Sequence, residues 1–222
     1  MALGGCAATP PEAPLRDPAA AVEIPRAPEA PRAEGSRAPA PEKVRCQDTE
    51  ECEARCSRGD GAGCTQLGLF ALAGNNGKVD RAAAMEHFKK ACDANDGEGC
   101  HRYGLFEEQR EARPALFTHA CELGSGDGCS ELGYLYEHGI DVRQDHAKAR
   151  SLYEKACTLK SALGCTNFGT LVEAGKGGPS DPARATKSYI EACDKGHPKG
   201  CHYAGIQVAA GVGIAKDDVR AR

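Results

Sequence analysis

The chain has 222 residues, of which 41% are hydrophobic, 27% charged and only 5% aromatic. Its formal charge of −4 excludes the broad positive surface that holds nucleic acid or anionic lipid through phosphate groups, so we expect no nucleic-acid partner. No apolar run approaches the roughly 18 residues that a membrane-spanning helix needs. The 13 cysteines exceed what a protein in a reducing compartment keeps, unless they bind metal.

The first six residues end in Leu3-Gly4-Gly5-Cys6, which resembles the site where bacterial lipoproteins are cleaved and acylated on cysteine. Neither a basic nor an apolar region precedes Cys6, so this stretch alone could not direct export. Either the true start lies upstream and Cys6 is lipidated, or the match is due to chance. If the resemblance holds, Ala7 in place of an aspartate implies sorting to the outer membrane, with the lipid as the chain's only membrane contact.

Residues 7–45 are predicted to form a disordered linker rich in proline, alanine and glutamate. They hold nine of the 13 prolines and none of the phenylalanines and tyrosines, so they cannot bury enough apolar surface to fold. Two interpretations remain open: a stiff spacer with a reach on the order of 100 Å, or a plain disordered tail.

From residue 56 onward the cysteines come in pairs eight positions apart. The pairs are Cys56 and Cys64, Cys92 and Cys100, Cys121 and Cys129, Cys157 and Cys165, and Cys193 and Cys201. The second cysteine of each pair begins a C-x-x-x-G motif, which ends at Gly68, Gly104, Gly133, Gly169 and Gly205. The pairs recur after 36, 29, 36 and 36 residues, and such a period is typical of stacked helical units.

Each repeat is predicted to be a pair of helices. The first helix ends at a loop glycine, at Gly74, Gly139, Gly175 and Gly211. The second begins at an aspartate that caps its free amides, at Asp80, Asp145, Asp181 and Asp217. We therefore predict that residues 46–222 form an all-α, right-handed superhelical solenoid of about five helix-turn-helix repeats.

Two repeats depart from this pattern. The one between Cys100 and Cys121 lacks seven residues and the loop glycine, and its second helix is expected to begin at Pro114. The last repeat is incomplete: the sequence stops at Arg222, three residues after Val219, which aligns with Ala147 early in a second helix. Because an unpaired helix exposes apolar surface, we expect a truncated reading frame or a partner chain there.

Paired cysteines at this spacing favour disulfides that join consecutive repeats. A turn of this length brings two cysteines within the Cα separation of 4.4 to 6.8 Å that a disulfide needs. Cys46 and Cys52 are expected to pair with each other, which leaves Cys6 as the odd thiol. Structural zinc usually takes four ligands from closely spaced cysteines; a cluster of Cys46, Cys52, Cys56 and Cys64 is the less favoured alternative.

These motifs together resemble the Sel-one-like repeat family over residues 52–222, and most closely its disulfide-bridged branch, the Helicobacter cysteine-rich proteins. The resemblance implies an α/α superhelix with the first helices on the concave side. It also implies export to the bacterial periplasm or cell surface, and binding of a protein or peptide partner. Some cysteine-rich members are described as penicillin-binding proteins with weak β-lactamase activity, which provides the alternative function.

The same resemblance places partner-binding residues on the first helices. The expected concave positions directly follow the second cysteines, at Thr65, His101, Ser130, Thr166 and His202, with Leu69, Leu105, Tyr134, Thr170 and Ile206 one turn further on. Glu108, Glu137 and Glu173 would then align as an acidic stripe. The stripe is interpreted either as a groove for a basic or extended peptide or as three solvated helix residues.

No catalytic motif is present in the sequence. It lacks S-x-x-K, K-T-G, H-E-x-x-H, a P-loop and C-x-x-C-H, so no catalytic residue is assigned and we expect no cofactor or metal ion. An exported binding scaffold is favoured over two alternatives. One is a weak β-lactam or peptidoglycan-fragment hydrolase, and the other is a redox or metal carrier, which would need free thiols.

Overall fold

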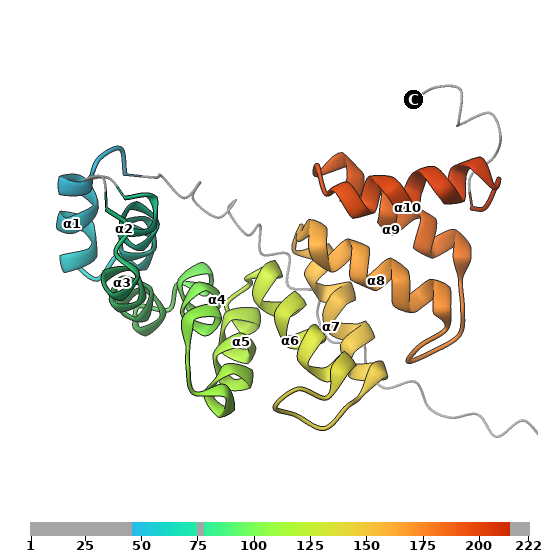
Figure 1. Ribbon diagram of the computed structural model, residues 1–222, viewed down its shortest axis with the longest axis horizontal. Helices are drawn as coiled ribbons and strands as arrows, with labels where there is room; N and C mark the ends of the chain where they lie inside the picture. Colours follow the sequence, from blue (N-terminus) through green and yellow to red (C-terminus); the bar gives the residue numbers. More distant parts are fainter. Residues whose placement is uncertain (1–45, 75–77, 214–222) are drawn as a thin grey trace, which may run out of the picture. The chain divides into compact units, whose positions relative to one another are not determined.

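The computed structural model describes residues 46–74 and 78–213. Within these ranges it contains helices and no strand (Figure 1). The helices are α1 Thr49–Ser57, α2 Gly61–Ala73, α3 Arg81–Asp93, α4 Gly97–Phe106, α5 Arg113–Glu122, α6 Gly126–His138, α7 His146–Thr158, α8 Ala162–Ala174, α9 Pro182–Asp194 and α10 Pro198–Ala209. The all-α prediction is confirmed. The predictions for Cys6, the linker 7–45, Asp217 and the end of the last repeat lie outside the described residues.

The helices pack in chain order, each against the next (Figure 1). The first helices of successive repeats also touch one another, so that α2 contacts α4, α4 contacts α6, α6 contacts α8 and α8 contacts α10. The second helices, α3, α5, α7 and α9, make no comparable contact with each other in this part of the chain. This arrangement confirms a solenoid of stacked pairs, with the first helices in the more closely spaced layer.

The predicted caps fix the ends of the helices. Asp80, Asp145 and Asp181 each accept a hydrogen bond at 2.9 Å from the backbone amide three residues on, at the start of α3, α7 and α9. Gly74 and Gly139 follow α2 and α6 with φ of 71° and 67°, the left-handed conformation that favours glycine. The local sequence signals for these helix ends are therefore confirmed.

In the short repeat, between Cys100 and Cys121, the helix boundaries differ from those predicted. Helix α4 ends at Phe106, and a 3₁₀ turn at Arg110–Ala112 leads into α5. Helix α5 begins at Arg113, so Pro114 occupies its second position and not its first. The expectation that Glu108 lies on the first helix was wrong, because α4 ends two residues before it. Without a loop glycine, the chain leaves α4 in an extended conformation at Glu107.

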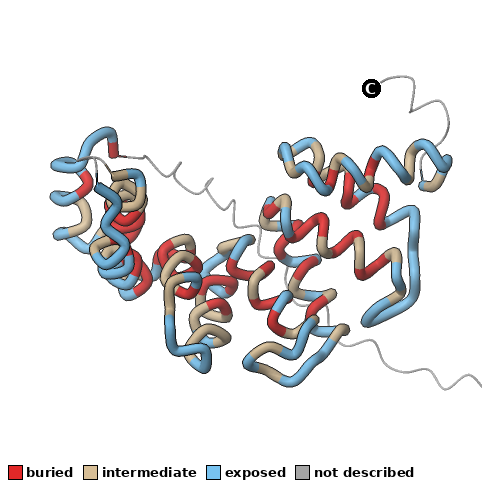
Figure 2. Tube along the Cα trace, in the orientation of Figure 1, coloured by how far each residue is buried: buried red, intermediate tan, exposed pale blue. Residues whose placement is uncertain are grey.

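Each C-x-x-x-G glycine that precedes a described second helix receives an aromatic ring from that helix. Phe88, Phe117, Tyr153 and Tyr189 are fully buried, and they lie against Gly68, Gly104, Gly133 and Gly169. A Cβ added at Gly133 would lie 2.8 Å from the Tyr153 ring, so the absent side chain makes room for the ring. Figure 2 shows the resulting buried stretches along the helices.

Six disulfides join the cysteines of the described residues. Five link consecutive repeats, between Cys56 and Cys64, Cys92 and Cys100, Cys121 and Cys129, Cys157 and Cys165, and Cys193 and Cys201. The predicted covalent links between repeats are thus confirmed. The sixth joins Cys46 to Cys52, with Cα atoms 5.4 Å apart. The four sulfurs of the alternative zinc cluster are all used in disulfides, so that alternative was wrong.

Candidate functional site

The positions that directly follow the second cysteines are mostly buried. Thr65, His101, Ser130 and Thr166 expose between 1% and 7% of their surface, whereas His202 is exposed. A partner cannot reach the four buried residues. The expectation that His101, Ser130 and Thr166 bind a partner is therefore corrected: these side chains are buried within the fold.

Two of these buried residues hold the start of the next first helix. The Thr65 hydroxyl donates to Asp96 Oδ2 at 2.7 Å, and Asp96 accepts from the amide of Gly99 in α4. Thr166 Oγ1 lies 2.9 Å from His197 Nδ1, and His197 caps α10 in the same way. A hydroxyl of one repeat thus secures the helix cap of the next, in addition to the nearby disulfide.

The acidic stripe is largely engaged within the fold. Glu137 Oε2 accepts from the Tyr153 hydroxyl at 2.8 Å, and Glu173 Oε2 accepts from the Tyr189 hydroxyl at 2.7 Å. Gln207 also donates to Glu173. Burial, followed by the adjacent carboxylate, raises the pKa of both tyrosines. Glu137 and Glu173 therefore hold tyrosines in place, and they do not form a free acidic surface.

Large apolar side chains are exposed one helical turn beyond the buried positions. Leu105 on α4, Tyr134 on α6 and Ile206 on α10 are 48%, 43% and 51% exposed. They occupy equivalent positions in their repeats. In the repeats of α2 and α8 the equivalent residues are Leu69 and Thr170, whose side chains are half-buried. We call Leu105, Tyr134 and Ile206 the apolar row.

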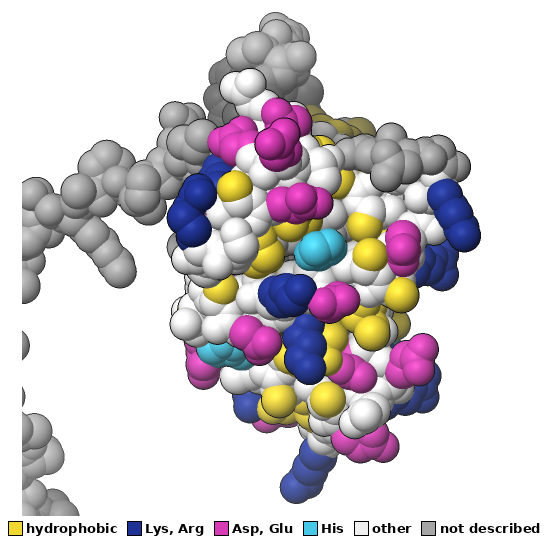
Figure 3. Space-filling view, turned by 90° about the vertical axis from the view of Figure 1, so that its left-hand side faces the viewer, with side chains coloured by type: hydrophobic (Ala, Val, Ile, Leu, Met, Phe, Trp, Pro, Cys, Tyr) yellow, Lys and Arg dark blue, Asp and Glu magenta, His cyan; other side chains and the backbone are white. Residues whose placement is uncertain are grey.

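Charged side chains of both signs are interspersed on the α1 end of the protein. Figure 3 shows acidic, basic and hydrophobic groups mixed on this face, with no extended area of one charge. Long-range attraction of a strongly charged partner to this face is therefore not expected. None of the described helices is long and apolar enough to cross a membrane.

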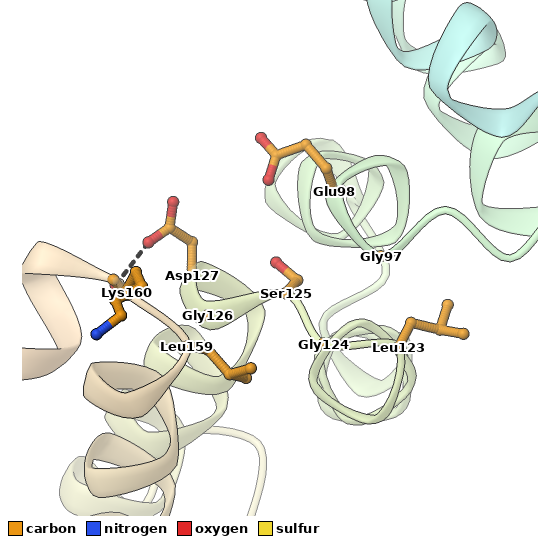
Figure 4. A pocket seen from close by; sticks show the side chains of 10 residues that line it. Gly97, Glu98, Leu123, Gly124, Ser125, Gly126, Asp127, Leu159 and Lys160 are labelled. Atoms are coloured by element: carbon orange, nitrogen blue, oxygen red, sulfur yellow. Dashed lines mark hydrogen bonds between the residues drawn. The ribbon is translucent and has the colours of Figure 1, made fainter. Parts of the chain in front are cut away.

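A cleft of about 320 Å³ lies where the junctions before α4, α6 and α8 meet (Figure 4). Glu98, Asp127 and Lys160 line it together with Leu123 and Leu159. Ser161, which caps α8, also donates its hydroxyl to Asp127 Oδ1 at 2.6 Å. The cysteine spacing gave no signal for this cleft, because its walls come from three different repeats.

The protein is an α-helical repeat protein whose consecutive repeats are linked by disulfides. Within each complete helix pair, an aromatic ring packs against a glycine. The Sel1 repeat family matches three of its units, at residues 61–96, 126–161 and 162–197. The chain belongs to the Sel1 repeat family, as the sequence motifs predicted.

Solved structures of related proteins have the same fold. A Sel1 repeat protein from Oxalobacter formigenes is 24% identical, with a TM-score of 0.64 over 75% of this chain and 78% of that one. The protective antigen c5321 of uropathogenic Escherichia coli, with an SLR fold, is 21% identical, with a TM-score of 0.62 over 77% of this chain and 38% of that one.

A third solved structure shares more of its sequence with this chain. Helicobacter pylori cysteine rich protein B is 34% identical over 57% of this chain and 98% of that one, with a TM-score of 0.48. A comparison with curated proteins gave no match.

Proposed function

We propose that the protein is an exported scaffold that binds a protein partner along the apolar row. Sel1 repeat proteins generally mediate protein–protein interactions. The observation that carries the proposal is the exposure of Leu105, Tyr134 and Ile206 at one repeat position on the first helices. Large apolar side chains left in solvent on a regular scaffold mark a contact surface, and tyrosine is enriched where binding energy concentrates.

This surface favours an apolar contact over a basic peptide. The two glutamates that would attract basic residues already accept hydrogen bonds from Tyr153 and Tyr189. Within the apolar row, the Tyr134 ring packs on His138 with 4.2 Å between ring centres. A partner that presents apolar side chains at the spacing of the repeats would bury all three residues of the row.

The disulfides support export. Six disulfides in one small protein persist in an oxidising compartment and are rare where glutathione keeps thiols reduced. The periplasm or the cell surface of a bacterium fits this chemistry. Attachment through a lipid on Cys6 stays a prediction.

Site-specific photo-crosslinking tests the proposal. A photoreactive residue is placed at position 105, 134 or 206, and at position 85 as the control, because Met85 is exposed to a similar degree (39%) but lies on a second helix. In non-reducing envelope extracts we expect one common partner at the three row positions. The triple variant Leu105→Ser, Tyr134→Ser, Ile206→Ser should bind that partner at least tenfold more weakly. Equal crosslinking at position 85 contradicts the proposal.

The hydrolase alternative receives no support from the geometry. Thr166 and His197 form a hydroxyl–imidazole contact, the kind of pair that activates a nucleophile. Thr166 is only 2% exposed, however, and His197 Nδ1 faces the start of α10 as its cap. A substrate cannot approach this hydroxyl.

A further inference from the structure

The hydroxyl contacts that secure the outer junctions are missing at two inner ones. Thr65 and Thr166 each reach the cap of the next first helix. At the corresponding positions, His101 Nδ1 and Ser130 Oγ are buried without a hydrogen-bond partner. They lie on α4 and α6, and the first turns of these two helices contribute to the lining of the cleft. Buried polar atoms are nearly always paired, so an unpaired imidazole nitrogen beside a polar cleft calls for a ligand.

Two carboxylates lie next to this unpaired nitrogen. Ligand atoms of Glu98, His101 and Asp127 all lie within 4.8 Å of one another. His101 Nδ1 is 3.9 Å from Glu98 Oε2, too far for a hydrogen bond, and the His101 side chain is only 9% exposed. Glu98 and His101 lie on α4, one helical turn apart, and Asp127 lies in the first turn of α6.

Each carboxylate is held by a neighbour through one of its oxygens. Arg102 Nε lies 2.7 Å from Glu98 Oε1, and the Ser161 hydroxyl donates to Asp127 Oδ1 at 2.6 Å. Glu98 Oε2 and Asp127 Oδ2 therefore remain for another ligand. Residues that orient the coordinating groups in this way are characteristic of metal sites in proteins.

We propose that Glu98, His101 and Asp127 bind a divalent transition-metal ion, with Zn²⁺ as the preferred ion. The site lies between α4 and α6, the first helices of two consecutive repeats. One imidazole with two carboxylates is a donor set that zinc accepts, and water would complete the coordination. In a tetrahedral site with ligands about 2.1 Å from zinc, the ligand atoms lie about 3.4 Å apart. The three side chains, now within 4.8 Å of one another, need to close by up to about 1.4 Å, which rotamer adjustment can supply.

The surrounding charges are compatible with a cation. Arg102 pairs with Glu98, and Lys160 lines the same cleft but also faces Glu191, with 3.6 Å between Nζ and Oε1. Glu131, half-buried on α6, adds a further negative group near His101. Two other groupings, Cys92 with Cys100 and His119, and Cys157 with Cys165 and Glu191, use disulfide sulfurs. A disulfide supplies no thiolate to a metal.

Calorimetric titration of the disulfide-intact full chain with ZnCl₂ tests the site. We expect saturable binding of one zinc ion per chain and a higher Tm in its presence, because the ion joins α4 to α6. Asp127→Asn retains the acceptor for Ser161 but removes the charge, and Glu98→Gln does the same for the other carboxylate. Each should weaken zinc binding at least tenfold.

The matched control is Glu86→Gln, which removes an exposed carboxylate on α3 that pairs with Lys90. It should leave zinc affinity unchanged. Absence of saturable zinc binding, or an Asp127→Asn variant that binds as tightly as the original chain, would overturn the proposal. Circular dichroism confirms that each variant is folded, so that a lost site is distinguished from a lost fold.

Discussion

The Tyr153 hydroxyl donates to Glu137 Oε2 at 2.8 Å while its ring fills the space above Gly133. Tyr189 makes the same two contacts one repeat later, with Glu173 and Gly169. The first helix thus offers a glycine for the ring and, four residues on, a carboxylate for the hydroxyl. In the earlier repeats the ring is a phenylalanine, which has no hydroxyl to donate, and the position four residues after Gly68 is Leu72, whose apolar side chain accepts no hydrogen bond.

Removing the carboxylate should cost more stability than removing the hydroxyl. Glu137→Ala leaves the tyrosine hydroxyl without its partner, and we expect a loss of about 1–2 kcal/mol in the free energy of unfolding. Tyr153→Phe should cost about 1 kcal/mol or less, because Phe88 already fills the equivalent place. Urea denaturation of both variants measures the difference. An equal or larger loss for Tyr153→Phe would contradict this account.

High pH should destabilise the fold through the same tyrosines. Their pKa is raised in the folded protein, so the neutral hydroxyls contribute fully below pH 10, the ordinary pKa of tyrosine. Above that pH the unfolded chain ionises while the folded one does not, and stability falls by about 1.4 kcal/mol per pH unit for each tyrosine. Absorbance at alkaline pH should show Tyr153 and Tyr189 ionising only as the protein unfolds. Ionisation of all tyrosines near pH 10 with the fold intact would disprove it.

Alanine should have opposite effects at two equivalent glycines. At Gly169 a Cβ would lie 2.5 Å from the Tyr189 ring, whereas at Gly205 it would meet nothing within 4 Å among residues 46–74 and 78–213. We expect Gly169→Ala to destabilise by about 1–3 kcal/mol through overpacking. Gly205→Ala should stabilise by roughly 0.5–1 kcal/mol, because alanine is the better helix former. Thermal melts of the two variants measure the change in Tm. A change of the same sign in both variants would be inconsistent with the ring contact.

The disulfides predict a thiol count and a dependence on oxidation. Twelve of the 13 cysteines are paired, so alkylation without reduction should label at most Cys6. Replacing both Cys157 and Cys165 by serine should cost up to about 2.5 kcal/mol, the loop-closure value for a short loop. Mass spectrometry and denaturation measure the two quantities. Several labelled thiols in the purified oxidised protein would favour the redox-carrier alternative.

Local features of the sequence were sufficient to predict the fold. The helix ends at Asp80 and Gly74 depend on side-chain and backbone chemistry within a few residues, and the disulfides depend on a turn of fixed length. The start of α5 was displaced by one residue because Pro114 is tolerated at either of the first two helical positions. Such details are decided by the neighbouring repeat as well as by the local sequence.

The site was harder to predict because it depends on how repeats contact one another. Thr65 and Leu69 lie one turn apart on the same side of α2, yet the next repeat covers Thr65 and leaves Leu69 half-exposed. A Cβ at Gly99 would come within 2.9 Å of Thr65 Oγ1, so the glycine lets the next helix begin directly over the threonine. Periodicity within one helix does not reveal that contact.

Every covalent crosslink in the described residues closes a loop of only six to eight positions. If the protein were pulled from its two ends, these crosslinks would withhold only their own short loops, and about four-fifths of the contour length could still be released. The protein would therefore yield under tension one hairpin at a time. Such behaviour would suit an extensible tether better than a rigid strut.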